Sequence, residues 1–195
     1  MTLEECTLRP YNSEALNFCS PFDCGHKDLN DFFANDSIDY SNQLLGKTYC
    51  FTANEDPKLV VAAFTVANDS IKTTHLPNAR KQKVNKLIPN VKRMRSYPAV
   101  LIGRLGVNSE FSRNGLGSEV MDFIKAWFIH DQNKTGCRYI VVDAYNEKRP
   151  LDYYIKNGFI YLFNDENQER EFLLIPDEAP LKSRLMFFDL IVLRN

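Results

Sequence analysis

The sequence lacks any apolar run close to the roughly 20 residues that cross a bilayer. Its first residues also lack the basic region followed by a hydrophobic stretch that marks a secretory signal peptide. Hydrophobic residues make up 44% and charged residues 25% of the 195 positions, which is typical of a water-soluble globular protein. We therefore expect a cytoplasmic protein without a membrane segment, folded as one domain over residues 1–195.

Metal-binding and cross-linking patterns are also missing. The five cysteines form no Cys-x-x-Cys pair, and only three histidines are present as further ligands. Structural zinc sites and disulfide frameworks need paired or regularly spaced cysteines. We therefore expect free thiols and no metal cofactor.

Acidic residues are absent from one stretch of the chain, although the net charge is only -1. This basic segment, residues 72–95, holds 8 of the 24 basic residues, so the rest of the chain has 16 basic residues against all 25 acidic ones. Such segregation can attract an anionic partner to a nearly neutral protein. The basic residues of the segment are Lys72, Arg80, Lys81, Lys83, Lys86, Lys92, Arg93 and Arg95.

Turn residues and apolar periodicity divide the chain into interleaved strands and helices. They predict strands at residues 3–11, 47–53, 58–67, 98–107, 137–144, 158–163 and 184–193. They predict helices at 28–43, with Asp28 as N-cap, at 115–130, and at 147–156, closed by Asn157 and Gly158. Residues 68–97 are interpreted as a partly helical insertion, and residues 164–182 as an acidic loop. The alternation predicts an α/β domain.

The most informative stretch is a strand, then a turn with two glycines, then the amphipathic helix at 115–130. Gly115 and Gly117 remove side chains where a backbone could approach a ligand. The first turn of a helix leaves N–H groups without partners and a partial positive charge, which suit a phosphate. Arg113 adds a full charge, and no acidic residue follows until Glu119. The pattern predicts a phosphate or pyrophosphate site.

Two common nucleotide motifs do not fit. The chain contains Gly46-Lys47-Thr48, but Ser41 stands where a Walker A loop needs its first glycine, and a strand follows. A Rossmann fingerprint would need a third glycine where Val120 stands. The phosphate site therefore belongs to another class.

Two further features accompany the turn. The strand before it ends in Leu105-Gly-Val, and later Tyr154 precedes a Gly-Phe pair near the end of a helix. In this order they resemble the GNAT acetyltransferase superfamily, which has a strand, a Gln/Arg-x-x-Gly-x-Gly/Ala loop and a later Tyr-x-x-x-Gly-Phe motif. The resemblance is specific from Val100 to Phe159. One position departs from the pattern, because Ser112 stands where the family has Gln or Arg.

The resemblance implies an α/β (α+β) fold with a central, mixed but mostly antiparallel, twisted sheet flanked by helices. It also implies acetyl-CoA as co-substrate, attacked directly by a primary amine. Tyr154 would protonate the departing thiolate, and we take the Val107 N–H as the oxyanion donor. Asn146 is a candidate for a CoA contact, with a turn role as the alternative. The other implied cofactor contacts are Leu105, Gly106 and Val107 for the pantetheine arm, and Ser112, Arg113, Asn114, Gly115, Leu116, Gly117 and Ser118 for the pyrophosphate.

A narrower resemblance covers more of the chain. Phe22-Asp-Cys-Gly, the strand that begins Tyr97-Pro-Ala-Val, and the closing Arg184-Leu-Met-Phe-Phe-Asp-Leu look like the toxin-type GNAT proteins. Those proteins acetylate the amino acid on charged tRNA, so this resemblance implies tRNA as the partner of the basic segment. Two other functions stay open: acetylation of another primary amine, and a non-catalytic CoA-binding module that interacts with a protein. The oligomeric state is also open, with a homodimer among the alternatives.

Overall fold

The computed structural model describes residues 1–176 and 178–194. They form two compact units: unit 1 comprises residues 1–67 and 102–127, and unit 2 comprises residues 68–101 and the described residues from 128 onward. Position 177, in the expected acidic loop, and position 195, at the end of the expected domain, lie outside the described residues. The prediction of a single domain stays a prediction.

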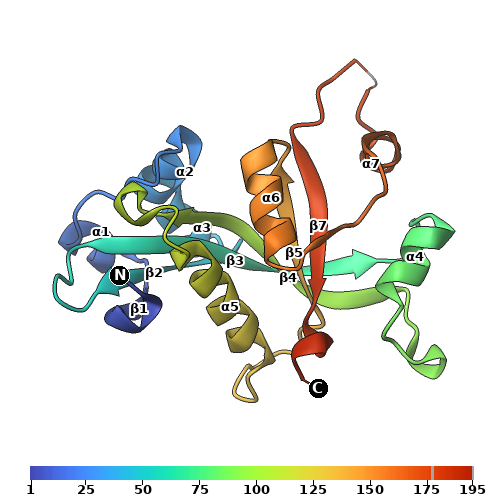
Figure 1. Ribbon diagram of the computed structural model, residues 1–195, viewed down its shortest axis with the longest axis horizontal. Helices are drawn as coiled ribbons and strands as arrows, with labels where there is room; N and C mark the ends of the chain where they lie inside the picture. Colours follow the sequence, from blue (N-terminus) through green and yellow to red (C-terminus); the bar gives the residue numbers. More distant parts are fainter. Residues whose placement is uncertain (177, 195) are drawn as a thin grey trace. The chain divides into compact units, whose positions relative to one another are not determined.

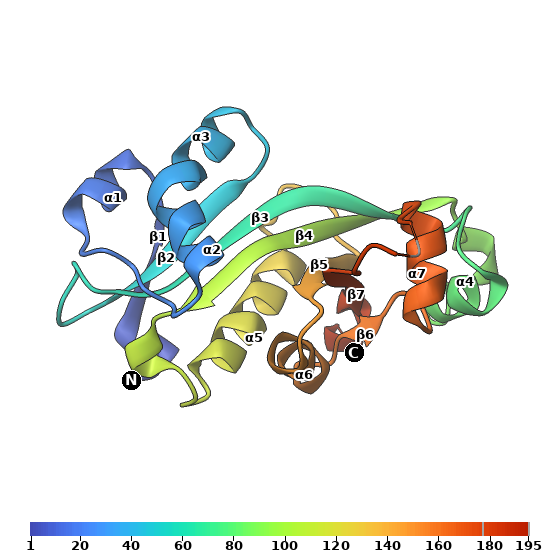
Figure 2. The same cartoon turned by 90° about the horizontal axis from the view of Figure 1, so that it is seen from above.

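Seven strands of the described residues belong to one sheet, in the order β1-β2-β3-β4-β5-β7-β6 (Figure 1). The pairs β1–β2, β2–β3, β5–β7 and β6–β7 are antiparallel. Together with the flanking helices, they confirm the expected α/β fold class. Strands β3 and β4 are long neighbours that contribute residues to both units (Figure 2). The strands are β1 (Cys6–Pro10), β2 (Lys47–Ala53), β3 (Val60–Lys72), β4 (Ser96–Val107), β5 (Tyr139–Tyr145), β6 (Ile160–Tyr161) and β7 (Ser183–Asp189).

In unit 1, helix α5 (Leu116–Ile129) packs its apolar stripe on the sheet. The ring of Phe123 meets that of Phe51 edge to face, with centroids 5.0 Å apart. Trp127 meets Tyr49 in the same way at 4.9 Å. Leu116, at the start of the helix, is 1% exposed. Burying such a stripe stabilises the helix and fixes where its N-terminus lies relative to β4.

The N-terminal helices of unit 1 surround a second core. They are α1 (Ser13–Phe18), α2 (Lys27–Asp31) and α3 (Ser37–Asn42). A π-helical turn, Phe32–Asp36, joins α2 to α3, and in it the Ser37 N–H donates to the carbonyl of Phe32. Phe33 is fully buried in this core.

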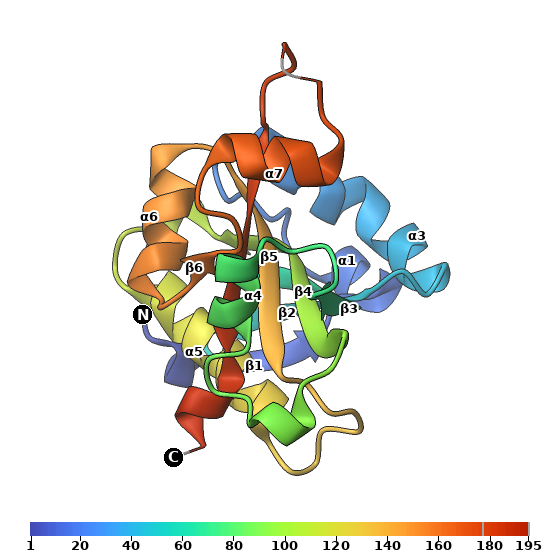
Figure 3. The same ribbon diagram turned by 90° about the vertical axis from the view of Figure 1, so that its right-hand side faces the viewer.

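In unit 2, the core gathers around Tyr139 of β5. Its ring packs edge to face on Phe187 of β7, and its hydroxyl donates to the carbonyl of Val84 at 2.7 Å. This bond ties helix α4 (Asn78–Val84) to the sheet. Two further helices, α6 (Lys148–Lys156) and α7 (Glu166–Leu173), belong to the unit, and α4 and α7 are seen in Figure 3.

Several predicted boundaries were wrong. The expected helix at 28–43 is interrupted by the π-helical turn, and His26 rather than Asp28 occupies the N-cap, because the chain is already helical at Lys27. The expected insertion is shorter than 68–97, because β3 continues to Lys72 and β4 begins at Ser96.

The C-terminal part differs most from the sequence prediction. The expected strand at 158–163 has only two paired residues, and the last strand ends at Asp189, whose carboxylate caps a short 3₁₀ turn. The expected acidic loop contains helix α7. Asp165 caps that helix by accepting the Gln168 N–H at 2.9 Å. This Asp-x-x-Gln spacing was a readable helix signal.

Candidate functional site

The predicted phosphate loop lies in unit 1, between β4 and α5. Arg113, Asn114 and Gly115 are exposed. Arg113 and Gly115 have positive φ angles of 71° and 89°. Residues other than glycine rarely adopt this backbone conformation. A side chain at Gly115 would meet no atom within 4 Å. The loop therefore holds an unusual backbone conformation next to open space.

The amides of this loop have unused hydrogen-bonding capacity. Within the described residues, the backbone N–H groups of Arg113, Asn114, Gly115 and Leu116 donate no hydrogen bond. Consecutive unpaired donors at a helix start can bind an anion, and the helix dipole adds partial positive charge there.

The two ends of the predicted loop are already engaged within the protein. The Ser112 N–H and hydroxyl both donate to the carbonyl of Ser109, and the Ser118 N–H donates to that of Gly115. Glu119, the first acidic residue of α5, accepts the Leu3 N–H at 2.6 Å. Ser112 thus shapes the loop. The unpaired amides run from Arg113 to Leu116, and those of Arg113, Asn114 and Gly115 belong to exposed residues.

The backbone N–H groups at the end of β4 point alternately toward β3 and away from it. The Asn108 N–H donates to the carbonyl of Val61 in β3 at 2.9 Å. Because successive N–H groups of a strand point to opposite edges, those of Leu105 and Val107 point away from β3. Side chains alternate as well, so Leu105 and Val107 share one face of β4. Val107 packs there beside the buried Leu116 of α5.

The other face of β4 carries Arg104 and Gly106. A Cβ at Gly106 would lie 3.1 Å from side-chain atoms of Cys24 and Phe22, so any other residue there would force these side chains of the loop at 22–25 to shift. The loop is held there by the Ser109 N–H, which donates to the carbonyl of Asp23 at 2.9 Å. The sequence associated Phe22-Asp-Cys-Gly with a family but did not predict where this segment lies in the fold. Gly106 was the signal in the sequence, because a glycine inside a central strand often marks a site where another segment approaches the backbone closely.

Tyr154 lies on α6 in unit 2, partly buried between aromatic neighbours. Its ring contacts those of Tyr153 and Phe159, with centroids 5.1 and 5.3 Å away. Burial raises the pKa of its hydroxyl well above the ordinary value. Within the described residues this hydroxyl makes no hydrogen bond. It therefore keeps its proton at neutral pH and can donate it to a ligand.

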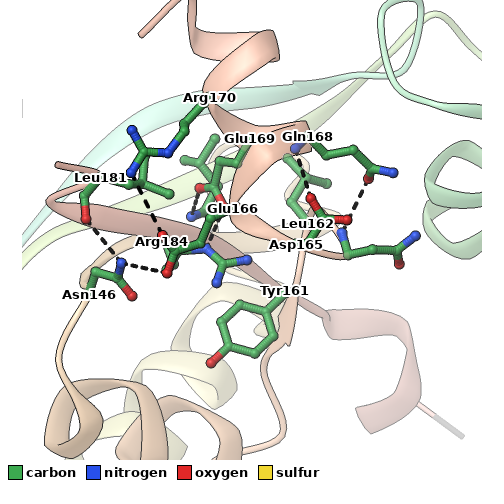
Figure 4. A network of polar contacts seen from close by, with 12 residues as sticks. Asn146, Tyr161, Leu162, Asp165, Glu166, Gln168, Glu169, Arg170, Leu181 and Arg184 are labelled. Carbon is green, nitrogen blue, oxygen red and sulfur yellow. Dashed lines mark hydrogen bonds and ion pairs between the residues drawn. The ribbon is translucent and has the colours of Figure 1, made fainter. Parts of the chain in front are cut away.

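Asn146, the other candidate in unit 2, is occupied by contacts within the protein (Figure 4). Its side-chain amide donates to the carboxylate of Glu166 and to the carbonyl of Leu181, each at 3.0 Å. In the same network, the buried Glu169 pairs with Arg184 at 2.7 Å. These bonds hold α7 to the sheet, which agrees with the structural alternative for Asn146.

The basic segment forms a hollow of about 550 Å³ in unit 2, which we call the basic pocket. Tyr97 holds two sides of it together, because its hydroxyl donates to Asn85 Oδ1 at 2.7 Å and accepts the Met94 N–H at 2.9 Å. Desolvation, with the like charges of Arg80 and Lys86, lowers the pKa of Lys83 beside it. The lining residues are Asn78, Lys81, Gln82, Asn85, Arg93, Met94 and Arg95.

Arg80 anchors the basic segment. It is 6% exposed, and it donates to the carbonyls of Leu162 and Tyr161 and to Asn164 Oδ1. Among the described residues it has no acidic partner, so its charge adds to that of the pocket. Helix α4 is thereby fixed to the segment around β6.

Over the described residues, all five cysteines are free thiols, and no group of three or more potential metal ligands comes together. None of the helices in this part of the chain is both long and apolar enough to cross a membrane.

Comparison with solved structures gives matches over nearly the whole chain. A Tyr-to-Phe mutant of KacT has a TM-score of 0.72 at 19% identity, covering 97% of this chain and 98% of that one. AtaT complexed with acetyl-methionyl-tRNAfMet has a TM-score of 0.71 at 17% identity, covering 97% of each chain. The protein has the fold of KacT and AtaT.

A third solved structure also matches over nearly the whole chain. AtaTR bound with AcCoA has a TM-score of 0.65 at 20% identity, covering 98% of this chain and 99% of that one. No family model matches the sequence. The shared fold confirms the fold predicted from the sequence motifs, and the chemistry has to be argued from this chain's own residues.

Proposed function

We propose that this protein is an acetyl-CoA-dependent N-acetyltransferase that transfers the acetyl group to a primary amine. The row of unpaired N–H groups from Arg113 to Leu116 carries this proposal, because it fits the pyrophosphate of CoA. Arg113, exposed beside the row, adds a charge-assisted contact. The match to AtaTR bound with AcCoA supports the choice of ligand.

The end of β4 would receive the rest of the co-substrate. The backbone edge at Leu105 and Val107 would pair with the amides of the pantetheine arm, with Gly106 between them. When bound, acetyl-CoA supplies a thioester whose carbonyl oxygen becomes negative as the amine attacks. The Val107 N–H is the proposed donor to that oxygen, since a fixed backbone donor stabilises developing charge without reorganisation.

Tyr154 is the proposed acid that protonates the departing thiolate. Its raised pKa makes it a weak acid, so positioning rather than acidity must drive the transfer. A desolvated hydroxyl with no partner of its own is suited to that role. Tyr-to-Phe mutants of both KacT and AtaT are among the matching structures. The matched test in this chain is Tyr154→Phe.

Two measurements test the proposal. Calorimetry should show that acetyl-CoA binds much more tightly than acetyl-pantetheine, which lacks the pyrophosphate. A transfer assay with a panel of amines should show turnover that falls in Tyr154→Phe without loss of acetyl-CoA affinity. Tight binding without turnover on any amine would instead identify the non-catalytic CoA-binding module.

Charged tRNA is the acceptor that a second observation favours. The basic pocket presents Lys81, Arg93 and Arg95 on a framework fixed by buried hydrogen bonds, and phosphate backbones bind such preorganised cations. The match to AtaT complexed with acetyl-methionyl-tRNAfMet supports this acceptor. The protein would then acetylate the α-amine of an amino acid carried on tRNA.

Salt dependence tests the tRNA acceptor. Each phosphate contact contributes about 0.9 to the slope of log affinity against log salt concentration. Lys81→Gln, Arg93→Gln and Arg95→Gln should each lower the slope by roughly one contact, whereas Lys47→Gln, an exposed lysine in unit 1, should not. An unchanged slope in all three variants would remove the basic pocket from tRNA binding.

A further inference from the structure

Arg104 is an unusual residue for its position. It is exposed in β4, three positions before the strand ends, where β-branched and apolar side chains are favoured. Its guanidinium lies 5.0 Å from the ring centroid of Phe32, and one of its N–H groups donates to the carbonyl of Gly103 at 2.7 Å. No carboxylate pairs with it among the described residues. The charge is held in place but not neutralised.

The element that holds Arg104 is itself irregular. Phe32 begins the π-helical turn Phe32–Asp36, and the Ser37 N–H reaches back five residues to its carbonyl. Single π-helical turns are rare, and they occur often at functional sites because the extra residue redirects the side chains of the helix. Here the turn places Phe32 against the guanidinium and Phe33 in the buried core.

The surroundings leave this charge available to a ligand. In the two segments that pack on this face of β4, Asp23 accepts from the Gly25 N–H and from Asn30, and Asp31 accepts from Asn35; neither forms an ion pair with Arg104. Arg104 shares its face of β4 with Gly106, the residue directly before the proposed oxyanion donor, Val107. The opposite face is closed by the buried start of α5.

We infer that Arg104 binds an anionic group of the acceptor, and that the preferred acceptor carries this group several ångströms from its reacting amine. This inference rests on the proposed function, because it takes the thioester to lie at Val107. Val107 lies three positions after Arg104, which is about 10 Å along an extended strand. A free amino acid, whose carboxylate lies two bonds from its amine, is too short for both contacts. A phosphate or a more distant carboxylate fits.

Matched acceptors test the inference. One pair is an amide-linked alanyl-adenosine with and without a 5′-phosphate; the other is alanyl-alanine with a free carboxylate and as its amide. The enzymes are wild type, Arg104→Gln, Arg104→Lys and the control Arg9→Gln, which changes an exposed arginine of β1 in the same unit. Kinetics with each acceptor, thermal unfolding and acetyl-CoA calorimetry are measured for all four.

We expect the wild type to prefer the anionic member of at least one pair by roughly tenfold through KM, with kcat unchanged, as for a charge-assisted contact that is made equally in the ground and transition states. Arg104→Gln should lose that preference, Arg104→Lys should keep part of it, and Arg9→Gln should keep all of it. The pair that shows the preference identifies the anion as phosphate or carboxylate.

Three results would overturn the inference: no preference in the wild type, an unchanged preference in Arg104→Gln, or an equal loss with neutral acceptors in that variant. Failure of the proposed function is separate, since the wild type would then either not bind acetyl-CoA in the calorimeter or bind it without turnover on any of the four acceptors. The exposed position of Arg104 makes a folding defect in Arg104→Gln unexpected.

Discussion

Replacing Gly115 with alanine should separate stability from coenzyme binding. Gly115 has a φ of 89°, a conformation that costs an L-residue about 1–2 kcal/mol. The new methyl group would meet no protein atom within 4 Å, so no steric penalty is added. For a chain of this size, 1 kcal/mol lowers Tm by about 2–4 °C. We therefore expect Gly115→Ala to fold and to melt only a few degrees lower than wild type.

In contrast to this small effect on stability, the affinity of Gly115→Ala for acetyl-CoA should fall strongly. The added methyl group occupies the open space beside the unpaired amides, where the phosphate oxygens are proposed to bind. Losing one charge-assisted hydrogen bond costs about 1.5–3 kcal/mol, which corresponds to a rise in Kd of roughly tenfold or more. Affinity for acetyl-pantetheine, which lacks the pyrophosphate, should not change. Isothermal titration with both ligands measures the difference.

Gly136→Ala is the matched control. A side chain at Gly136 would likewise meet no atom within 4 Å, the φ of this residue is not in the positive region, and it lies in a loop of unit 2. This variant should bind both ligands as wild type does. Normal acetyl-CoA binding by Gly115→Ala, or an equal loss of affinity for acetyl-pantetheine, would show that the phosphate oxygens do not bind beside Gly115.

Further predictions concern unit 2. Tyr154→Phe should lower the transfer rate at least about tenfold and leave acetyl-CoA affinity unchanged, as general acids contribute roughly that much or more; an unchanged rate would remove Tyr154 from the mechanism. Folding raises the pKa of Tyr154 above the value of about 10 that it has in the unfolded chain. The stability that comes from burying the protonated hydroxyl is therefore fully present below about pH 10 and is lost as the pH rises above that value. Denaturant titrations at pH 9 and 11 should show a smaller loss for Tyr154→Phe than for wild type. Glu169→Ala leaves the buried Arg184 without its partner and should cost about 3–5 kcal/mol, seen as a fall in Tm of roughly 10 °C; a change of a degree or two would contradict this. Arg80→Gln leaves the Tyr161 and Leu162 carbonyls without donors and should both lower Tm by several degrees and weaken tRNA binding, whereas Arg95→Gln should weaken binding alone.

The sequence predicted the parts of the fold that depend on local pattern. Two local signals predicted α5 and α6 to within a residue or two at each end: the Asn-Gly pair after α6, and the apolar residues that repeat along α5, which are Leu116, Val120, Phe123, Ile124, Trp127 and Phe128. Gly115 marked the loop because its conformation excludes most side chains. These signals are local, so no knowledge of tertiary contacts was needed.

Other features depend on partners far away in the sequence. The π-helical turn after α2 has no local signature, and the helical periodicity alone gave one continuous helix. The engagement of Asn146 with Glu166 and Leu181 could not be foreseen, because α7 itself was assigned to a loop. The packing of Cys24 on Gly106 likewise joins segments more than eighty positions apart.

The central claim is that the amides from Arg113 to Leu116 bind the pyrophosphate of acetyl-CoA. The most direct test is to follow the backbone amide resonances of ¹⁵N-labelled protein during titration with acetyl-CoA and with acetyl-pantetheine. We expect the resonances of these four amides to shift and to gain protection from hydrogen exchange with acetyl-CoA, but not with acetyl-pantetheine. If acetyl-CoA binds while these four resonances stay unchanged, the claim is wrong.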